Sequence, residues 1–206
     1  SGFKAPSLFN LYDPAFGNPD LKPEKSLGFD AGIEQFLYND LISIGVTYFQ
    51  NNYKDLFGYD QNFRTVNIKK AKTKGIETFI TAKVIDDFIL KLNYTYTNAK
   101  DESDGTPEEN KILLRRPEHK IGSYISYNLN QAINLNLEMV YVGKRQDLIF
   151  DNVTFTSSRT ELEPYVLVNF AANYQLLKFL SLNLRLENLL NSKYEEVYGY
   201  ASPGIS

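Results

Sequence analysis

Apolar and polar residues alternate with a period of two along several segments of the chain. Between Phe88 and Tyr96 the even-numbered positions are aromatic or aliphatic, while most odd-numbered positions are polar. Residues 133–141 and 180–187 show the same alternation. Successive side chains of a β-strand point to opposite faces, whereas an amphipathic helix repeats every three or four residues, so these segments are predicted strands. Weaker alternation predicts strands near 25–37, 41–53, 74–84, 120–129 and 165–176, and no segment predicts a convincing helix.

The connections between the eight predicted strands alternate strictly between short and long. Tight turns are predicted at 38–40, 85–87, 130–131 and 177–178, and longer polar stretches at roughly 54–66, 98–112, 143–163 and 192–206. In an antiparallel meander, alternate connections lie at opposite ends of the sheet, so the short turns share one end. Short turns at one end and long loops at the other are typical of outer-membrane β-barrels.

Aromatic residues bracket the aliphatic part of the predicted apolar rows. Phe88 is next to a tight turn, whereas Tyr48, Tyr96 and Tyr141 are next to the long stretches. Two belts of aromatic side chains around an aliphatic band are typical of a strand that crosses a membrane. We therefore expect the even-numbered row from Phe88 to Tyr96 to face lipid.

The odd-numbered positions of the same strand are expected to face the lumen, and they include Lys91, Asn93 and Thr95. Two other architectures remain open at this point. A soluble β-sandwich would turn this polar face to water, and an autonomous eight-stranded barrel would close without further strands.

Composition excludes several classes of protein. The 206 residues carry 22 Lys and Arg against 25 Asp and Glu, a net charge of −3, so we expect no nucleic-acid partner. The absence of Cys excludes disulfides, thiolate metal sites and cysteine catalysis. No apolar run exceeds four residues, whereas a membrane-spanning helix needs about 20.

Five ordered sequence blocks resemble signatures of the TonB-dependent outer-membrane receptors. They are GFKAPSL and GNPDLKPE within 2–24, VN, KA and KGIE within 66–77, LLRRP at 113–117, ENLLNSKY at 187–194, and YGY with PG within 198–204. Because the blocks cover essentially the whole chain in order, the match is specific. The pairing of LLRR with the segment YEEVYGY at 194–200 looks most like the receptors for cobalamin.

The resemblance implies an all-β fold, an antiparallel up-and-down meander that forms part of a 22-stranded transmembrane barrel. Residues 1–206 are similar to the C-terminal part of that barrel. The plug domain, the N-terminal strands and one last strand after Ile205–Ser206 are absent from this sequence. The implied location is the bacterial outer membrane. The implied partners are outer-membrane lipid, the plug domain and remaining barrel strands, the TonB complex, and a small-molecule ligand of the cobalamin or siderophore type.

Two residues are predicted to contact that ligand. Arg115 matches the first arginine of the LLRR block, which contacts ligand in the cobalamin receptors, and it should stand at the start of a strand, at the rim of the lumen. The alternative is that Arg115 and Arg116 form a charged pair in water. Phe150 stands where the family supplies a contacting Tyr, and it keeps the ring but not the hydroxyl.

The remaining candidates favour no chemistry. His119, the single histidine, is interpreted as an ordinary strand-end residue, because no metal or catalytic partners accompany it. The acidic stretch 101–105 with Glu108 and Glu109 lacks the ligand spacing of an EF-hand and is interpreted as a solvated loop. We therefore predict no enzyme, no catalytic residue, no cofactor and no metal site.

Overall fold

The computed structural model describes residues 1–59, 64–104 and 110–206 of the chain. The elements are β1 (Gly2–Lys4), α1 (Leu8–Tyr12), β2 (Glu24–Leu37), β3 (Ile42–Tyr59), β4 (Thr65–Ile85), β5 (Phe88–Asp101), β6 (His119–Asn130), β7 (Ile133–Val142), β8 (Arg145–Asp151), β9 (Thr156–Leu162), β10 (Tyr165–Leu177), β11 (Leu180–Leu186), β12 (Glu195–Val197) and β13 (Tyr200–Ala201). Within these ranges, no helix has the length and apolar character that crossing a membrane requires.

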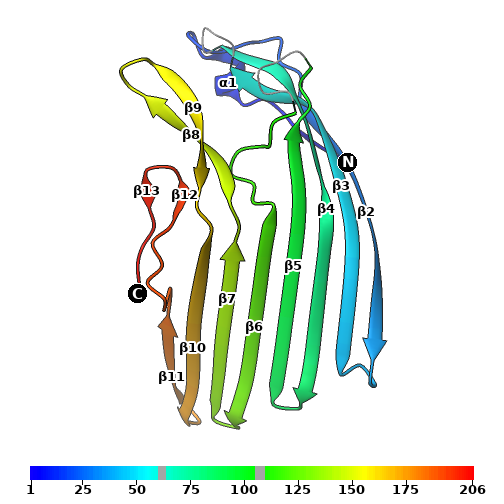
Figure 1. The fold of residues 1–206 in the computed structure, drawn as a ribbon, viewed down its shortest axis with the longest axis vertical. Coiled ribbons are helices and arrows are strands. Elements are labelled where there is room, and N and C mark those ends of the chain that lie inside the picture. The colour runs from blue at the N-terminus through cyan, green and yellow to red at the C-terminus, as the bar shows by residue number, and fades with distance from the viewer. Residues whose placement is uncertain (60–63, 105–109) are drawn as a thin grey trace. The chain divides into compact units, whose positions relative to one another are not determined.

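Nine strands form one open sheet, in the order β1-β2-β3-β4-β5-β6-β7-β10-β11 (Figure 1). Strands β8 and β9 form a separate hairpin, as do β12 and β13. The eight predicted strands and the antiparallel meander are thereby confirmed. A β-sandwich is excluded for the described residues, because they contain no second large sheet that could cover the first.

The sequence prediction was wrong at several places. β3 continues to Tyr59 and β4 begins at Thr65, so most of the stretch 54–66 is strand. The short elements α1 and β1 and the hairpins β8–β9 and β12–β13 were not predicted. These segments were missed because their backbone hydrogen bonds form without a long alternation of apolar and polar residues in the sequence.

The chain forms two compact units, and β2, β3, β4 and β5 contribute residues to both. The first unit comprises Ser1–Ala31, Tyr48–Gly75 and Asn98–Leu113. The second unit comprises Gly32–Thr47, Ile76–Thr97 and Leu114–Ser206.

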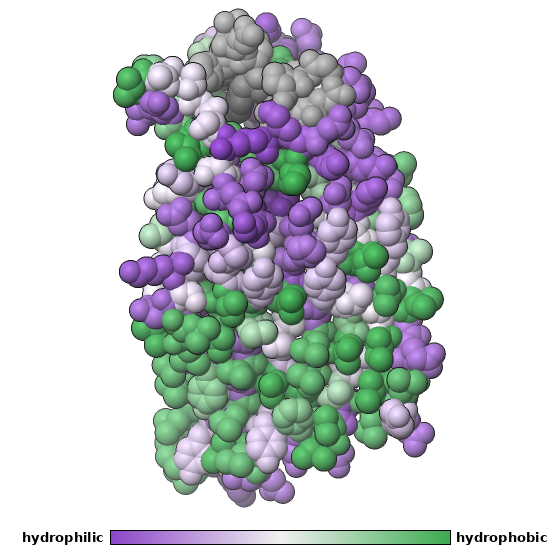
Figure 2. All heavy atoms as spheres, in the orientation of Figure 1, coloured by the Kyte–Doolittle hydropathy of each residue, from purple (hydrophilic) through white to green (hydrophobic). Residues whose placement is uncertain are grey.

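In the second unit, strand register gathers apolar side chains on one face of the sheet. Leu90 pairs with Ile125, Ile125 with Leu137, Leu137 with Phe170, and Phe170 with Leu186, which gives one apolar row across five strands. On the face drawn in Figure 2, apolar side chains gather over the parts of β5, β6 and β7 nearest the tight turns. This row is not covered by other parts of the described chain, since Leu137 is 39% exposed.

The opposite face of the same strands is polar and hydrogen-bonded. Lys91 pairs with Tyr124 and Tyr124 with Glu138, whose carboxylate accepts a hydrogen bond from Asn169 Nδ2 at 3.2 Å. The Tyr124 hydroxyl donates to Asn136 Oδ1 at 2.5 Å. The predicted separation of an apolar and a polar face is therefore present in the strand pairing itself.

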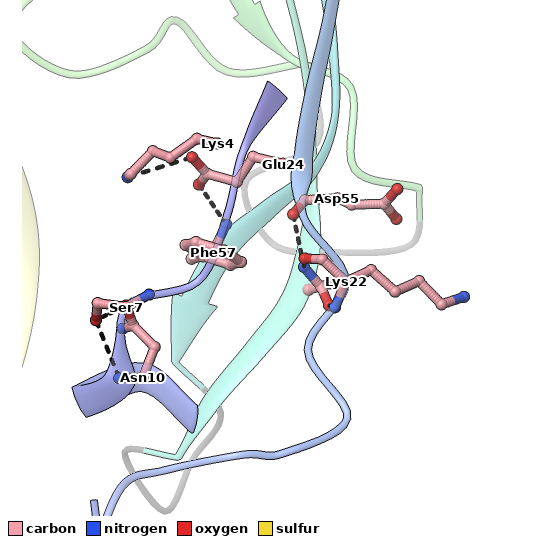
Figure 3. Close-up of polar contacts among 8 residues, drawn as sticks. Lys4, Ser7, Asn10, Lys22, Glu24, Asp55 and Phe57 are labelled. Carbon is pink, nitrogen blue, oxygen red and sulfur yellow. Dashed lines mark hydrogen bonds and ion pairs between the residues drawn. The ribbon is translucent and has the colours of Figure 1, made fainter. Parts of the chain in front are cut away.

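In the first unit, the segment that carries the GNPDLKPE block is attached to β3 and β4 by side chains (Figure 3). Asn67 of β4 accepts a hydrogen bond from the Lys22 N–H at 2.7 Å and donates to the Lys22 and Asp55 carbonyls at 2.8 and 2.7 Å. Glu24 accepts the Phe57 N–H at 2.8 Å and forms an ion pair with Lys4 at 3.3 Å. Residues of the GNPDLKPE and VN blocks therefore hold the backbone in place.

The short helix α1 begins with a reciprocal cap, which Figure 3 also shows. The Asn10 N–H donates to Ser7 Oγ, and the Ser7 N–H donates to Asn10 Oδ1, each at 3.1 Å. This arrangement is a capping box in which Asn takes the place of the usual Glu or Gln. The cap satisfies N–H groups that a helix of five residues leaves unpaired at its start.

Candidate ligand-binding site

The carboxylate of Asp147 in β8 joins three distant segments of the second unit. Its side chain is 0% exposed. Oδ1 accepts a hydrogen bond from Arg115 Nε at 2.8 Å, in a charge-assisted pair, and Oδ2 accepts the backbone N–H of Tyr198 at 2.7 Å. The LLRRP block, the β8–β9 hairpin and the C-terminal YGY segment therefore meet at one buried group.

The surroundings of Asp147 keep its carboxylate charged. Burial alone would raise its pKa, because a low-dielectric environment disfavours the charged form. The N–H groups of Tyr198 and Leu148 and the Arg115 guanidinium act in the opposite direction, and together they hold the pKa of Asp147 below its ordinary value. At neutral pH the carboxylate is therefore ionised and can hold Arg115.

Arg115 lies in a turn before β6, and the prediction that it begins the strand was wrong. β6 begins at His119, because Pro117 has no N–H to donate to a neighbouring strand. Arg115 has a φ of 58°, in the left-handed region that non-glycine residues adopt only at a cost. Its N–H donates to the Gln146 carbonyl at 2.7 Å, and its side chain is 50% exposed. The structure thus fixes one edge of the guanidinium and leaves the rest accessible.

A second arginine, Arg145, is buried and holds the same loops through hydrogen bonds. The sequence pattern predicted no role for its side chain. It is 5% exposed, and its guanidinium donates to the carbonyls of Gly143 and Glu195 at 2.9 and 2.7 Å. It also stacks over the ring of Tyr165, with 4.9 Å between Cζ and the ring centroid. Arg145 is therefore a structural residue, because burial removes it from any ligand.

Phe150, the other predicted ligand residue, lies further along β8 in the hairpin. Its side chain is 54% exposed and meets the ring of Phe155 edge-on, with 6.3 Å between the centroids. Side chains alternate along a strand, so Phe150 points to the face of β8 opposite to Asp147. Phe150 therefore lies on the face of β8 opposite to the carboxylate that orients Arg115.

The ENLLNSKY block holds the chain after β11. Asn188 Nδ2 donates to the carbonyls of Ser192 and Pro203 at 3.0 and 3.2 Å, and its Oδ1 accepts the Ser192 N–H at 2.8 Å. Ser192 Oγ donates to the Val166 carbonyl at 2.6 Å. These polar side chains form hydrogen bonds with the backbone. A structural role therefore accounts for the polar residues of the ENLLNSKY block without any contact with a ligand.

An open groove of about 620 Å³ lies beside this segment, lined by residues that include Glu161, Glu163, Tyr194 and Tyr198. Its volume is in the usual range for a small-molecule site. Neither Arg115 nor Phe150 lines it.

The remaining predicted residues have ordinary surroundings. His119 begins β6, as predicted, and its Nδ1 lies 2.9 Å from the hydroxyl of Tyr94. Of the acidic stretch, Asp101 is buried and accepts the Ser103 N–H at 2.8 Å, while Gly105, Glu108 and Glu109 lie outside the described residues. Among the residues that are described, no three His, Cys, Asp or Glu side chains come together in a group that could hold a metal ion.

The chain is similar to known proteins along nearly all of its length. The family model described as "TonB dependent receptor-like, beta-barrel" matches residues 1–189. The vitamin B12 transporter BtuB of Vibrio cholerae serotype O1 is 29% identical over 208 residues, which covers 97% of this chain and 31% of the relative. The vitamin B12 transporter BtuB of Vibrio vulnificus is 27% identical over 205 residues, with 96% and 30% covered. The chain thus spans about a third of the length of these relatives.

Solved structures show the same fold at lower identity. A mutant of the ferric enterobactin receptor PfeA of Pseudomonas aeruginosa superposes with a TM-score of 0.76 at 21% identity, covering 98% of this chain and 35% of that one. The ferripyoverdine receptor of the Pseudomonas aeruginosa outer membrane gives a TM-score of 0.73 at 19% identity, with 90% and 26% covered.

Proposed function

Since this chain belongs to the TonB-dependent receptors of the outer membrane, as part of their β-barrel, we propose that it forms the C-terminal wall and loops of a receptor that imports a scarce ligand. The full receptor would use a plug domain, the remaining barrel strands and the TonB complex. The ligand belongs to the cobalamin or iron-siderophore class, and transport proceeds by binding and release rather than by catalysis.

One observation carries this proposal, the match of nearly the whole chain to vitamin B12 transporters. The fold supports it, because the apolar face of the sheet is exposed and the opposite face is polar, as a barrel wall requires. A cobalamin-type ligand is the first choice, since the two siderophore receptors compared above resemble the chain only in fold.

We assign the polar contact with the ligand to Arg115. Its side chain is half-exposed, its turn is held in a costly backbone conformation, and Asp147 orients its guanidinium. The exposed donors suit amide, phosphate or carboxylate groups of a large polar ligand. Phe150, with Phe155, supplies an apolar contact from the other face of the hairpin.

Arg115→Ala in the full-length receptor tests this assignment. We expect the affinity for cyanocobalamin to fall about 5- to 150-fold, which corresponds to the loss of one charge-assisted hydrogen bond. Equilibrium binding to the purified receptor measures it, with a panel of ferric siderophores titrated in parallel. Arg116→Ala is the matched control, because it removes the same charge from the neighbouring position.

Equal losses in the two variants, or unchanged affinity in a folded Arg115→Ala receptor, would contradict the assignment to Arg115. A wild-type receptor that binds neither cyanocobalamin nor any ferric siderophore would overturn the proposed ligand class itself.

A further inference from the structure

The first unit contains a hollow of about 740 Å³ that no part of the proposed function uses. Residues of β1, β2, β3 and β4 line it, and three of them are lysines, Lys25, Lys54 and Lys70. Phe3 and Leu27 supply an apolar part of the lining, and Glu102 supplies one carboxylate. The hollow therefore combines several cations with an apolar surface.

Strand geometry places Lys25 and Lys54 on the apolar face of β2 and β3, since Lys54 lies an even number of positions after Tyr48. Alternation along β2 puts Lys25, Leu27 and Phe29 on one face, and the Phe29 ring lies 5.9 Å from that of Tyr48 in β3. The alternate residues of β2, such as Gly28, lie on the opposite face of the sheet. There a side chain at Gly28 would collide with Asn51 of β3. Along this face an aromatic pair is thus followed by Leu27 and then by cations.

The apolar residues of this face are highly exposed. Leu27 is 64% exposed and Phe29 56%. Phe3 pairs with Lys25 in the register of β1 and β2, so an aromatic ring and an ammonium group stand side by side. Large apolar side chains at this exposure are expected against lipid, and aromatic residues followed by lysines mark the level of the head groups.

The charges of the hollow are incompletely compensated. Lys70 Nζ lies 2.7 Å from Asp104 Oδ2. Lys25 and Lys54 are exposed, and in the described parts of the chain neither has a carboxylate within ion-pair distance. Two ammonium groups are therefore available to an anion, although Glu102 lines the same hollow.

We propose that this hollow binds the phosphate-bearing head group of an anionic lipid, with the acyl chains against Leu27 and Phe29. A phosphate group matches the charge of Lys25 and Lys54, and lysine binds phosphate as a point charge. A soluble anion would leave the apolar half of the hollow without a partner, whereas a phospholipid fills both halves. Basic pockets beside an apolar membrane surface recognise lipid head groups by this combination.

Native mass spectrometry of the full-length receptor in detergent tests the site, with dioctanoyl phosphatidic acid as the probe. Changing Lys25, Lys54 and Lys70 together to Gln should weaken its binding about 25-fold, because each of the two unpaired lysines contributes roughly fivefold. Changing the same three residues to Arg should preserve binding. A control receptor with Lys83→Gln, Lys91→Gln and Lys120→Gln loses the same charge outside the hollow and should bind like the wild type.

Two competitors identify the source of the anion. Dioctanoyl phosphatidylcholine should bind more weakly than dioctanoyl phosphatidic acid. Inorganic phosphate at the same concentration should not displace the bound phosphatidic acid. Equal affinities of the Gln triple variant and the control would overturn the site, provided that circular dichroism shows the same strand content. Equal binding of phosphatidylcholine, or displacement by inorganic phosphate, would overturn the lipid head group as its occupant.

Discussion

At the scale of single residues, Asp147 shows how a buried charge is retained. Each of its carboxylate oxygens accepts a hydrogen bond from a different segment, and Arg115 supplies a counter-charge. An ionised carboxylate without such partners would be strongly disfavoured away from water. The pair therefore orients Arg115 and attaches the C-terminal segment through Tyr198.

The sign of the Asp147 pKa shift predicts how this attachment depends on pH. Because the folded-state pKa lies below the unfolded value of about 3.8, the stabilisation is fully present above that value. It is lost as pH falls through the folded-state pKa. Asp147→Asn should remove about 1–3 kcal/mol of local stability at neutral pH, since a hydrogen bond to a charged group is lost.

Amide hydrogen exchange at Tyr198 in the full-length receptor measures this effect. In Asp147→Asn we expect faster exchange than in the wild type at neutral pH, with the difference disappearing in strong acid. Asp151→Asn is the control, because its carboxylate bonds the N–H groups of Val153 and Thr154 within its own turn. Slow exchange at Tyr198 in both variants would contradict the role given to Asp147.

The sequence could predict some of these residues but not others. The LLRR block points to Arg115 and the following loop to Phe150, and their contact with a ligand stays a prediction. Asp147 carries no local signal, because a single Asp in a polar stretch resembles any solvated carboxylate. Its burial depends on Arg115 and Tyr198, which are 32 and 51 positions away in the chain.

At the scale of elements, the regularity of the apolar–polar alternation decided what the sequence could predict. The boundaries of β7 and β11 and the start of β5 were predicted closely, because these strands alternate from their first residues. β3 was predicted to end near residue 53, because polar residues follow and Asp55 has a φ of 57° that interrupts the regular strand. β8 and β9 have the same seven-residue length as β11 but lack its regular alternation of apolar and polar residues, so their sequence did not distinguish them from a loop.

The two faces of β5 should respond differently to a charge. Leu92 pairs with Ser123 on the apolar face, whereas Asn93 lies on the polar face, where it fills the space above Gly122. An arginine at Leu92 should cost about 2–4 kcal/mol near the middle of the membrane, and an arginine at Asn93 far less. Urea titrations of the full-length receptor refolded into lipid vesicles measure both costs, and equal values would contradict the assignment of faces.

At the scale of the whole molecule, the nine-stranded sheet has two open edges, at β1 and β11. Each edge carries unpaired backbone N–H and C=O groups, which lipid cannot satisfy. The 206-residue chain expressed alone should therefore self-associate in detergent, as measured by size-exclusion chromatography with light scattering. Co-expression with the rest of the receptor should give one folded barrel, and a monodisperse, strand-rich monomer of the isolated chain would argue against this expectation.

The meeting of three segments at Asp147 also has a consequence for the order of folding. Tyr198 lies 51 positions after Asp147 in the chain, so this hydrogen bond closes a longer loop than the bond between Arg115 and Asp147, which are 32 positions apart. Contacts between residues so far apart in sequence form slowly, because closing a long loop costs entropy before the contact repays it. The Asp147–Tyr198 bond is therefore a late step of assembly. Until it forms, Asp147 holds Arg115 but does not yet hold the C-terminal segment.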